Sequence, residues 1–375
     1  MKGPRASRTS LNVGVIGCGV ISGAYFAATR QFPVLNITAC ADLDKSAAER
    51  AASRWGVAAL TVDELLARDD LEMVLNLTVP HAHASVTLAA LGAGKHVYLE
   101  KPLALDRAEG ERMLAAAEAA DLRVGCAPDT FLGAGLQTCQ RLVESGAIGR
   151  VVAGTAFMMG PGHEGWHPNP DFYYRRGGGP LFDMGPYYLT ALVQLLGPVR
   201  RVSAMAAVTH DTRTITSEPR RGERIPVEVP THVSGTLEFV SGALVTLVMS
   251  FDVQAHTNGP LELHGERGSL QVPDPNTFGG PVRVRLAGAD TWAEQPLVNG
   301  YTDNVRGIGA ADLAQAVLTG RPGRAHSSLA YHVLDVMQAL LEAAETGSRQ
   351  EIASRCERPE PLPLGVGGGV LEASV

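Results

Sequence analysis

Short apolar segments alternate with helix-forming segments through the first third of the chain, and this alternation constrains the fold more than any other feature. The apolar segments are LNVGVIG (11–17), NITACAD (36–42), MVLNLTV (73–79), HVYLEK (96–101) and RVGCAP (123–128). We interpret them as strands buried on both faces, since the segments between them have helix-forming composition and several end in glycine. Strands that alternate with helices predict βαβ units and a doubly wound parallel sheet.

The pattern changes after about residue 129, where a helix and a strand lead into a loop rich in glycine, proline and aromatic residues at 160–179. Two hairpins follow, at 231–252 with a turn at Ser241 and Gly242, and at 261–272 with a turn near Arg267 and Gly268. Helices are expected near 303–319 and 328–346. The second part is therefore predicted to be an α+β domain with a large, mainly antiparallel open sheet. We place a disordered tail at 1–10, the domains at 11–128 and 129–362, and a loose tail at 363–375.

Length and composition exclude several classes of protein. A chain of 375 residues exceeds the size at which one core stops growing, so two domains are expected. A formal charge of −7 without a dense basic run argues against a nucleic-acid partner. No stretch of about 18 apolar residues is present, so no membrane span is expected. Five cysteines, odd in number and without a Cys-x-x-Cys pair, indicate reduced thiols in a cytoplasmic protein.

The first predicted strand runs into GVIGCGVISG, which has the spacing of a dinucleotide-binding turn. Glycine at 17 and 19 permits a sharp turn and the approach of a pyrophosphate to the N–H groups of the next helix, although Ser22 stands where a third glycine is usual. A tight strand-to-helix turn without a ligand is the alternative. Asp42, at the end of the second strand, can accept hydrogen bonds from ribose hydroxyls and would repel a 2′-phosphate. NAD is preferred, and nearby Lys45 leaves NADP as the alternative.

Further cofactor candidates follow the fourth and fifth apolar segments, in TVPHAHA and EKPLA. Lys101 follows a parallel strand at its carboxyl end, where such sheets bind ligands. Its alternative is a solvated surface lysine, which its apolar neighbours make less attractive. The cofactor-binding candidates are Gly17, Gly19, Val20, Ile21, Asp42, Thr78, Pro80, His83, Glu100 and Lys101.

The segment GGGPLFDMGPYYL (177–189) combines three glycines with a carboxylate and two phenols. The glycines would let the backbone pass close to a ligand. Asp183 and Tyr187 lie one helical turn apart and so share a face, whereas Tyr188 faces elsewhere and is expected to pack.

These motifs together resemble the Gfo/Idh/MocA family, named for glucose–fructose oxidoreductase and inositol dehydrogenase. The resemblance covers nearly the whole chain and depends on GVIGCGVIS, AGKHVYLEKP, ESGAIGRV and GGGPLFDMGPYYLTALVQLLGPV. It implies a Rossmann domain, a second domain that covers the nicotinamide and forms oligomers, and NAD(P)-dependent redox chemistry at a secondary alcohol of a sugar or cyclitol. It also implies that Lys101 is catalytic, that Asp183 assists it, and that His83 lies near the cofactor.

One position departs from the family pattern. Four residues after the aspartate many members carry a proton-transferring histidine, and this chain has Tyr187. A phenol has an ordinary pKa of about 10, against about 6.5 for imidazole. Either Lys101 lowers the phenol pKa and Tyr187 transfers the proton, or Tyr187 orients the substrate and Lys101 transfers it.

The loop before the glycines offers aromatic and hydrogen-bonding side chains that suit a sugar ring, and packing is their alternative role. The substrate-binding candidates are Lys101, Trp166, His167, Tyr173, Asp183 and Tyr187. His163 and His167 have helical metal-ligand spacing, but the surrounding glycine and proline argue against a helix, so we expect no metal ion.

We therefore expect a cytoplasmic NAD(P)-dependent dehydrogenase or reductase of CH–OH groups, with a homodimer or homotetramer formed through the second domain's sheet. Two alternatives are an NAD-dependent enzyme that cleaves glycosides by transient oxidation, and a non-catalytic nucleotide-sensing regulator. Retention of both Lys101 and Asp183 argues against the regulator.

Overall fold

The computed structural model describes residues 9–373 and divides the chain into two compact units. Unit 1 contains the chain up to Gly133, then Asn299–Tyr331 and the segment from Leu362 onward. Unit 2 contains Ala134–Val298 and His332–Pro361. The first eight residues of the predicted N-terminal tail lie outside the described part, and the first strand begins at Leu11.

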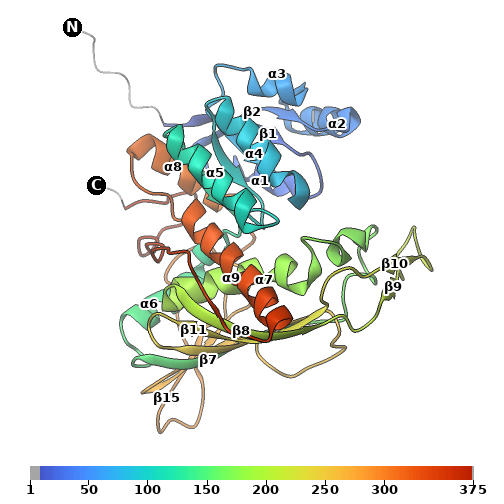
Figure 1. Cartoon of the computed structure of the whole chain (residues 1–375). Coiled ribbons are helices and arrows are strands. Elements are labelled where there is room, and N and C mark those ends of the chain that lie inside the picture. Colours follow the sequence, from blue (N-terminus) through green and yellow to red (C-terminus); the bar gives the residue numbers. More distant parts are fainter. Residues whose placement is uncertain (1–8, 374–375) are drawn as a thin grey trace. The chain divides into compact units, whose positions relative to one another are not determined.

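Unit 1 is built on a parallel sheet with the strand order β3-β2-β1-β4-β5-β6, six strands within the described residues. This is the doubly wound order that places ligands outside the carboxyl ends of the strands. Figure 1 shows β1, β2 and the helices α1–α5 in blue to teal, and α8, from later in the chain, in orange. The strands are β1 (Leu11–Ile16), β2 (Leu35–Ala41), β3 (Ala58–Leu60), β4 (Met73–Asn76), β5 (His96–Leu99) and β6 (Val124–Cys126). The helices are α1 (Ser22–Ala28), α2 (Lys45–Trp55), α3 (Val62–Leu66), α4 (His83–Gly92), α5 (Arg107–Ala119) and α8 (Ile308–Thr319).

Local sequence accounts for these elements. The central strand β4 is buried at all of its positions, as expected for a parallel sheet covered on both faces. Helix α2 begins where the Asp44 side chain accepts a hydrogen bond from the Ser46 N–H, 2.9 Å away, and ends at Gly56 in the left-handed conformation.

The last segment of the chain differs from the prediction of a loose tail. Leu362 and Leu371 are buried, the Gly300 N–H donates to the Val366 carbonyl at 2.8 Å, and the Tyr301 hydroxyl donates to the Val370 carbonyl at 2.6 Å. Of the large apolar side chains in this glycine-rich stretch, Val366 and Leu371 are buried, whereas Leu364 and Val370 are exposed. The predicted continuous second domain, 129–362, likewise differs from the observed units, because 299–331 returns to unit 1.

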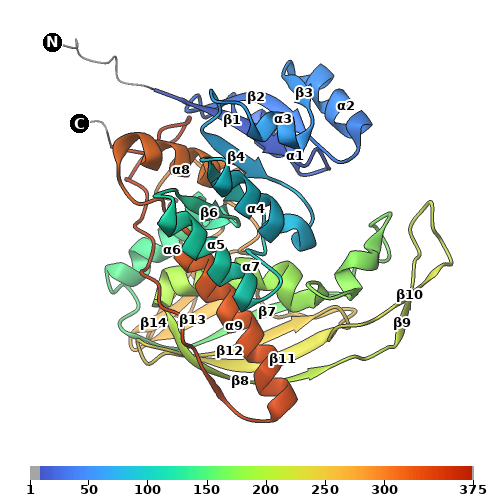
Figure 2. The same ribbon diagram turned by 45° about the horizontal axis from the view of Figure 1, so that its top comes forward.

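Unit 2 is built on a sheet with the order β16-β15-β14-β13-β7-β12-β11-β8-β17, nine strands within the described residues. Both predicted hairpins are present, as β11–β12 and β13–β14, and the sheet is mixed because β7 and β12 pair in parallel. A separate β9–β10 ribbon extends at one end of the sheet (Figure 2). The strands are β7 (Val151–Met159), β8 (Val199–Ala207), β9 (Thr212–Thr214), β10 (Arg224–Pro226), β11 (His232–Phe239), β12 (Leu244–Ser250), β13 (Leu261–Gly265), β14 (Gly268–Val272), β15 (Arg283–Leu286), β16 (Ala293–Glu294) and β17 (Gln350–Glu351).

Helices cover one face of this sheet. They are α6 (Ala134–Glu144), α7 (Gly179–Leu196) and, from His332 onward, α9 (Ser327–Thr346). Helix α7 packs on β7, β11 and β12, and the Leu340 side chain of α9 lies close to Gly235 of β11. The other face exposes side chains that alternate with the buried ones, among them Met205 and Leu244. No helix within residues 9–373 is long and apolar enough to cross a membrane.

Candidate active site

The turn after β1 requires glycine at position 17. Gly17 has a φ of +100°, and a Cβ there would lie 2.6 Å from the carbonyl carbon of Leu77. Gly19 differs, because a Cβ at that position would meet no heavy atom within 4 Å. The Ser22 hydroxyl donates to the Gly19 carbonyl at 2.7 Å, which gives the serine in the third motif position a structural role at the start of α1. The backbone above Gly19 is therefore open to a ligand.

Asp42, at the end of β2, binds this turn through hydrogen bonds of its carboxylate. One carboxylate oxygen accepts the Cys18 N–H at 2.7 Å and the other accepts the Asp44 N–H at 2.8 Å. An ionised carboxylate offers about four acceptor positions, so two remain for hydroxyl groups of a ligand. Val20 and Leu43 on either side are almost fully exposed, at 103% and 98%. These residues fit a ribose and an adenine that bind over the carboxyl ends of β1 and β2.

The loop after β4 is joined to the loop after β5 by His83. Its ring is fully buried, with Nδ1 2.7 Å from the Pro102 carbonyl oxygen and Nε2 3.0 Å from the Thr78 carbonyl oxygen. Burial lowers the pKa of His83, although the two carbonyl groups oppose this shift. The predicted cofactor neighbour thus holds two loops together.

Glu100 and Lys101 follow β5. The Glu100 carboxylate accepts the Tyr25 hydroxyl at 2.8 Å and the Lys101 N–H at 3.1 Å. The Lys101–Pro102 peptide bond is cis. Because β1, β2, β4 and β5 are parallel, the residues after their carboxyl ends lie along one edge of the sheet. The structure therefore brings the predicted cofactor residues of unit 1 to a common edge.

Contacts with the chain's own backbone explain two of the three glycines at 177–179, where α7 begins. A Cβ on Gly178 would lie 2.5 Å from the Phe172 carbonyl oxygen, and a Cβ on Gly179 would lie 2.9 Å from the Pro230 carbonyl oxygen. Gly179 also has a φ of +76°. That these glycines also let the backbone pass close to a ligand stays a prediction. In the structure they let the loop fold back tightly at the start of α7.

The folded loop brings His163 against Asp183, a pairing that the sequence analysis missed. The distance from Nε2 to Oδ2 is 2.8 Å, and the two side chains are 15% and 12% exposed. His163 precedes a short turn in which the His167 N–H donates to its carbonyl at 3.0 Å. The spacing of the two histidines suggested only a metal site, whereas the residue that pairs with His163 lies 20 positions further on. Residues 9–373 contain no group of three or more metal-ligating side chains.

The predicted substrate residues of the loop gather around this histidine. Ring centroids lie 3.9 Å from His163 for Tyr173 and 5.2 Å for Trp166, and His167 lies 5.3 Å from Trp166. Burial lowers the pKa of His167. Trp166 remains 62% exposed.

Tyr187 and Tyr188 are both buried, at 8% and 3% exposure. The Tyr188 hydroxyl donates to the Phe157 carbonyl at 3.4 Å, and burial raises its pKa. Its predicted packing role is consistent with this environment. Tyr187 lies one turn after Asp183 on α7.

A buried ion cluster holds the loop on the β9–β10 ribbon. Arg213 contacts Glu164 at 3.2 Å and also pairs with Asp252, and each of these side chains is 10% exposed. The Tyr174 hydroxyl donates to Glu164 at 2.5 Å. Glu164 follows His163 in the chain, but its carboxylate is paired with Arg213 and Tyr174.

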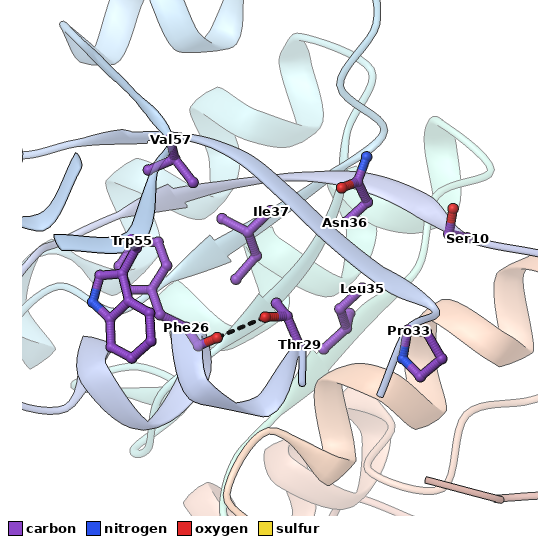
Figure 3. A pocket seen from close by; sticks show the side chains of 9 residues that line it. All are labelled: Ser10, Phe26, Thr29, Pro33, Leu35, Asn36, Ile37, Trp55 and Val57. Carbon is purple, nitrogen blue, oxygen red and sulfur yellow. Dashed lines mark hydrogen bonds between the residues drawn. The ribbon is translucent and has the colours of Figure 1, made fainter. Parts of the chain in front are cut away.

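A separate cavity of about 320 Å³ lies in unit 1, where Trp55 stacks on Phe26 with ring centroids 5.5 Å apart (Figure 3). Ser10 and Leu35, which line it, are at the amino ends of β1 and β2. This cavity is therefore at the opposite edge of the sheet from Gly19 and Asp42, and it is distinct from the predicted cofactor site.

The strand order of unit 1, its glycine turn and the acid after β2 define a dinucleotide-binding domain. The chain belongs to the GFO/IDH/MocA oxidoreductase family. Residues 11–127 match the model described as "Oxidoreductase family, NAD-binding Rossmann fold", and residues 136–271 match the GFO/IDH/MocA C-terminal domain. The predicted family, the α/β fold class and the assignment as an NAD-binding oxidoreductase are confirmed.

Curated relatives include dehydrogenases and reductases. A dTDP-3,4-didehydro-2,6-dideoxy-alpha-D-glucose 3-reductase of Saccharopolyspora spinosa is 30% identical over 71% of this chain and 75% of the relative. Levoglucosan dehydrogenase of Pseudarthrobacter phenanthrenivorans is 27% identical, over 70% and 73%. Inositol 2-dehydrogenase of Gluconacetobacter diazotrophicus is 25% identical, over 92% and 96%.

Solved structures support the fold. Levoglucosan dehydrogenase in complex with NADH and L-sorbose has a TM-score of 0.80 at 22% identity, and it covers 92% of this chain and 100% of its own. An NAD-binding oxidoreductase from Klebsiella pneumoniae has a TM-score of 0.81 at 23% identity, with the same coverage.

Proposed function

We propose that this protein is an NAD-dependent dehydrogenase or reductase that acts on a secondary alcohol or ketone of a sugar or cyclitol. The observation that carries the proposal is the position of Lys101, directly after β5 on the sheet edge that also holds the Gly17–Gly19 turn and Asp42. Relatives named inositol 2-dehydrogenase and levoglucosan dehydrogenase support the substrate class.

The residues of unit 1 fit the cofactor. The open backbone at Gly19 and the N-terminus of α1 would bind the pyrophosphate, with Val20 and Ile21 beside it, and the remaining acceptor positions of Asp42 would bind the ribose. Thr78, Pro80 and Glu100 lie on the same edge, and His83 positions their loops. The negative charge of Asp42 favours NAD over NADP. Bound nicotinamide would supply the hydride acceptor or donor.

The chemistry of the chain's own residues concerns the proton and the oxygen. When an alcohol loses hydride from carbon, negative charge develops on its oxygen, and the Lys101 ammonium group can stabilise that charge by a hydrogen bond. Asp183 would hold the ammonium group in position. Lys101 and Tyr187 are the two proton carriers that the sequence predicts. Trp166, His167 and Tyr173 would contact the sugar ring.

A panel of sugars, polyols and inositols with NAD and with NADP tests the proposal, with formation of the reduced nicotinamide followed by absorbance. We expect turnover with NAD and at least one polyol. The variant Lys101→Met should lower kcat/KM by a factor of about 100 or more while NAD affinity is retained, because one charged group at the reacting oxygen is lost. Wild-type turnover in Lys101→Met would remove Lys101 from the mechanism, and glycoside turnover without added cofactor would indicate the transient-oxidation alternative.

A further inference from the structure

His163 and Asp183 form a hydrogen-bonded pair inside unit 2 that the family motifs do not include. The histidine comes from the loop after β7, and the aspartate lies in the second turn of α7. Their 2.8 Å contact depends on the tight return of the loop at Gly178 and Gly179. Both side chains are mostly buried, but neither is sealed from solvent.

The hydrogen bond determines which nitrogen of His163 carries the proton. An ionised carboxylate can only accept, so Nε2 is the donor, and in the neutral ring Nδ1 bears the lone pair. Among residues 9–373, the contact with Asp183 is the one hydrogen bond made by this ring. An imidazole that a carboxylate holds through one nitrogen, with the other nitrogen unprotonated, has the arrangement of an oriented general base.

The surroundings of the ring are largely aromatic. Tyr173 and Phe251 have ring centroids 3.9 and 4.6 Å away, and Trp166 completes the set. The titratable groups that face His163 are Asp183 from α7, His167 from its own loop, and Tyr173 and Tyr174 from the 3₁₀ turn Pro170–Tyr174.

We infer that His163 is the proton-transfer group of unit 2, with Asp183 as the residue that orients it. The inference depends on the proposed function. In alcohol oxidation the C–H bond breaks and its hydride goes to nicotinamide, the O–H bond breaks and its proton goes to Nδ1 of His163, and the C=O bond forms. Lys101 then holds the oxygen without losing its own proton. Reduction of a ketone reverses each of these steps.

This assignment gives Tyr187 the role of orienting the substrate. A phenol ordinarily titrates near pH 10, whereas histidine is the side chain whose charge ordinarily changes between pH 5 and 8. An imidazole is therefore the better suited of the two groups to accept a proton, and Tyr187 is left to orient the substrate.

The pH dependence of kcat/KM, measured with NAD and the best alcohol of the panel, tests this assignment. The wild type should lose activity on the acid side, because an imidazolium ion cannot accept the proton of the substrate. His163→Gln should lower kcat/KM at neutral pH by a factor of about 100 or more. It should also abolish the fall of kcat/KM at low pH, called here the acid limb of the profile. Tyr187→Phe should keep the acid limb, and the matched control His264→Gln, on β13 with Nδ1 2.9 Å from Ser269 Oγ, should resemble the wild type.

The possible failures have different signatures. If no alcohol is oxidised by the wild type, the proposed function and this inference both fail. If an alcohol is oxidised and the acid limb persists in His163→Gln or disappears in Tyr187→Phe, only the assignment to His163 fails. A second readout needs no turnover: ¹⁵N NMR of histidine-labelled protein, with the signal identified by its loss in His163→Gln, should show neutral His163 protonated at Nε2. A proton on Nδ1 would overturn the assignment.

Discussion

Gly17 and Gly19 lie in one turn but are needed for different reasons. At Gly17 both the positive φ and the 2.6 Å approach to the Leu77 carbonyl group exclude a side chain. At Gly19 the fold leaves space for a Cβ, so the fold itself does not require glycine there. Glycine thus has a structural role at position 17, whereas the role that we propose for it at position 19 is ligand binding.

Alanine substitutions should separate these roles. Gly17→Ala should lower the free energy of unfolding by about 2 kcal/mol, because Cβ meets a backbone group in a strained conformation. Gly19→Ala should leave the unfolding transition almost unchanged and weaken NAD binding. Thermal denaturation and isothermal titration calorimetry measure the two effects. Unaltered NAD affinity in a folded Gly19→Ala variant would place the pyrophosphate elsewhere.

Individual site residues differed in how far the sequence could predict them. Asp42 and Lys101 were found because the position of a residue at the end of a parallel strand follows from the strand pattern alone. His163 was missed because its contact with Asp183 depends on the path of a loop. The one local signal near it, a histidine spacing of four, suggested a different chemistry.

At the scale of elements, the loop that carries His163 depends on Arg213. This cation bridges Glu164 and Asp252 in a mostly buried position and stacks on the Tyr174 ring, 5.5 Å from its centroid. Removal of a buried cation leaves two carboxylates without compensation.

Arg213→Met should therefore destabilise unit 2 by about 3–5 kcal/mol, as measured by urea unfolding. The control is Arg150→Met, since Arg150 pairs with Glu266 at 2.8 Å with both side chains more than half exposed. That substitution should change stability by less than about 1 kcal/mol. Equal effects of the two variants would contradict the role of the buried cluster.

The attachment of α9 to the sheet predicts a pH dependence. His332 is fully buried, its Nε2 accepts the Val199 N–H at 2.9 Å, and Nδ1 lies 2.8 Å from the Ser354 hydroxyl. Burial lowers its pKa to about 4, although Asp335 opposes this shift. A histidine in the unfolded chain titrates near pH 6.5. As pH falls, His332 therefore gains a proton in the unfolded state at a higher pH than in the folded state.

Stability from this residue is thus complete above about pH 6.5 and is lost toward pH 4, by about 3 kcal/mol in total. Urea unfolding from pH 7 to pH 4 should show a smaller acid loss in His332→Gln than in the wild type. If the free energy of unfolding changed with pH identically in the two proteins, His332 would have the same pKa in the folded and unfolded states, which would contradict this prediction.

The elements themselves were well predicted from the sequence where periodicity or turn chemistry is local. Strands β1, β2, β4, β5 and β6, both hairpins and the final helices lie close to the expected residues. The three-residue strand β3 was missed because a segment that short shows no periodicity. The parallel pairing of β7 with β12 was also missed, since it joins segments far apart in the chain.

At the scale of the whole molecule, the uncovered face of the unit 2 sheet supports the predicted oligomer. Met205 is 82% exposed and Leu244 is 50% exposed on strands whose opposite faces are buried. Apolar side chains on an open sheet face are typical of protein interfaces. We propose that a homodimer or homotetramer forms through this face.

Leu244→Lys should shift the protein to smaller assemblies in light scattering coupled to size-exclusion chromatography, because a charge would be buried in the interface. Leu364→Lys is the control, since Leu364 is 67% exposed but lies outside the sheet. A monomeric wild type, or dissociation by both substitutions alike, would contradict the proposed interface.

The division of the chain into units could be predicted only in part. The change of pattern near residue 129 falls close to the division at Gly133. The return of 299–331 to unit 1 has no signature in the helix pattern of that segment, since an apolar helix face does not specify the unit against which it packs.

The central proposal is that Lys101 stabilises the oxygen of an alcohol that is oxidised beside bound nicotinamide, and that His163 accepts its proton. A crystal structure of the complex with NAD and an alcohol identified by the panel tests it most directly. The proposal predicts that the reacting hydroxyl lies within hydrogen-bonding distance of Lys101 Nζ and His163 Nδ1, with Asp183 bonded to Nε2 of His163. A bound alcohol whose reacting hydroxyl contacts neither residue would contradict it.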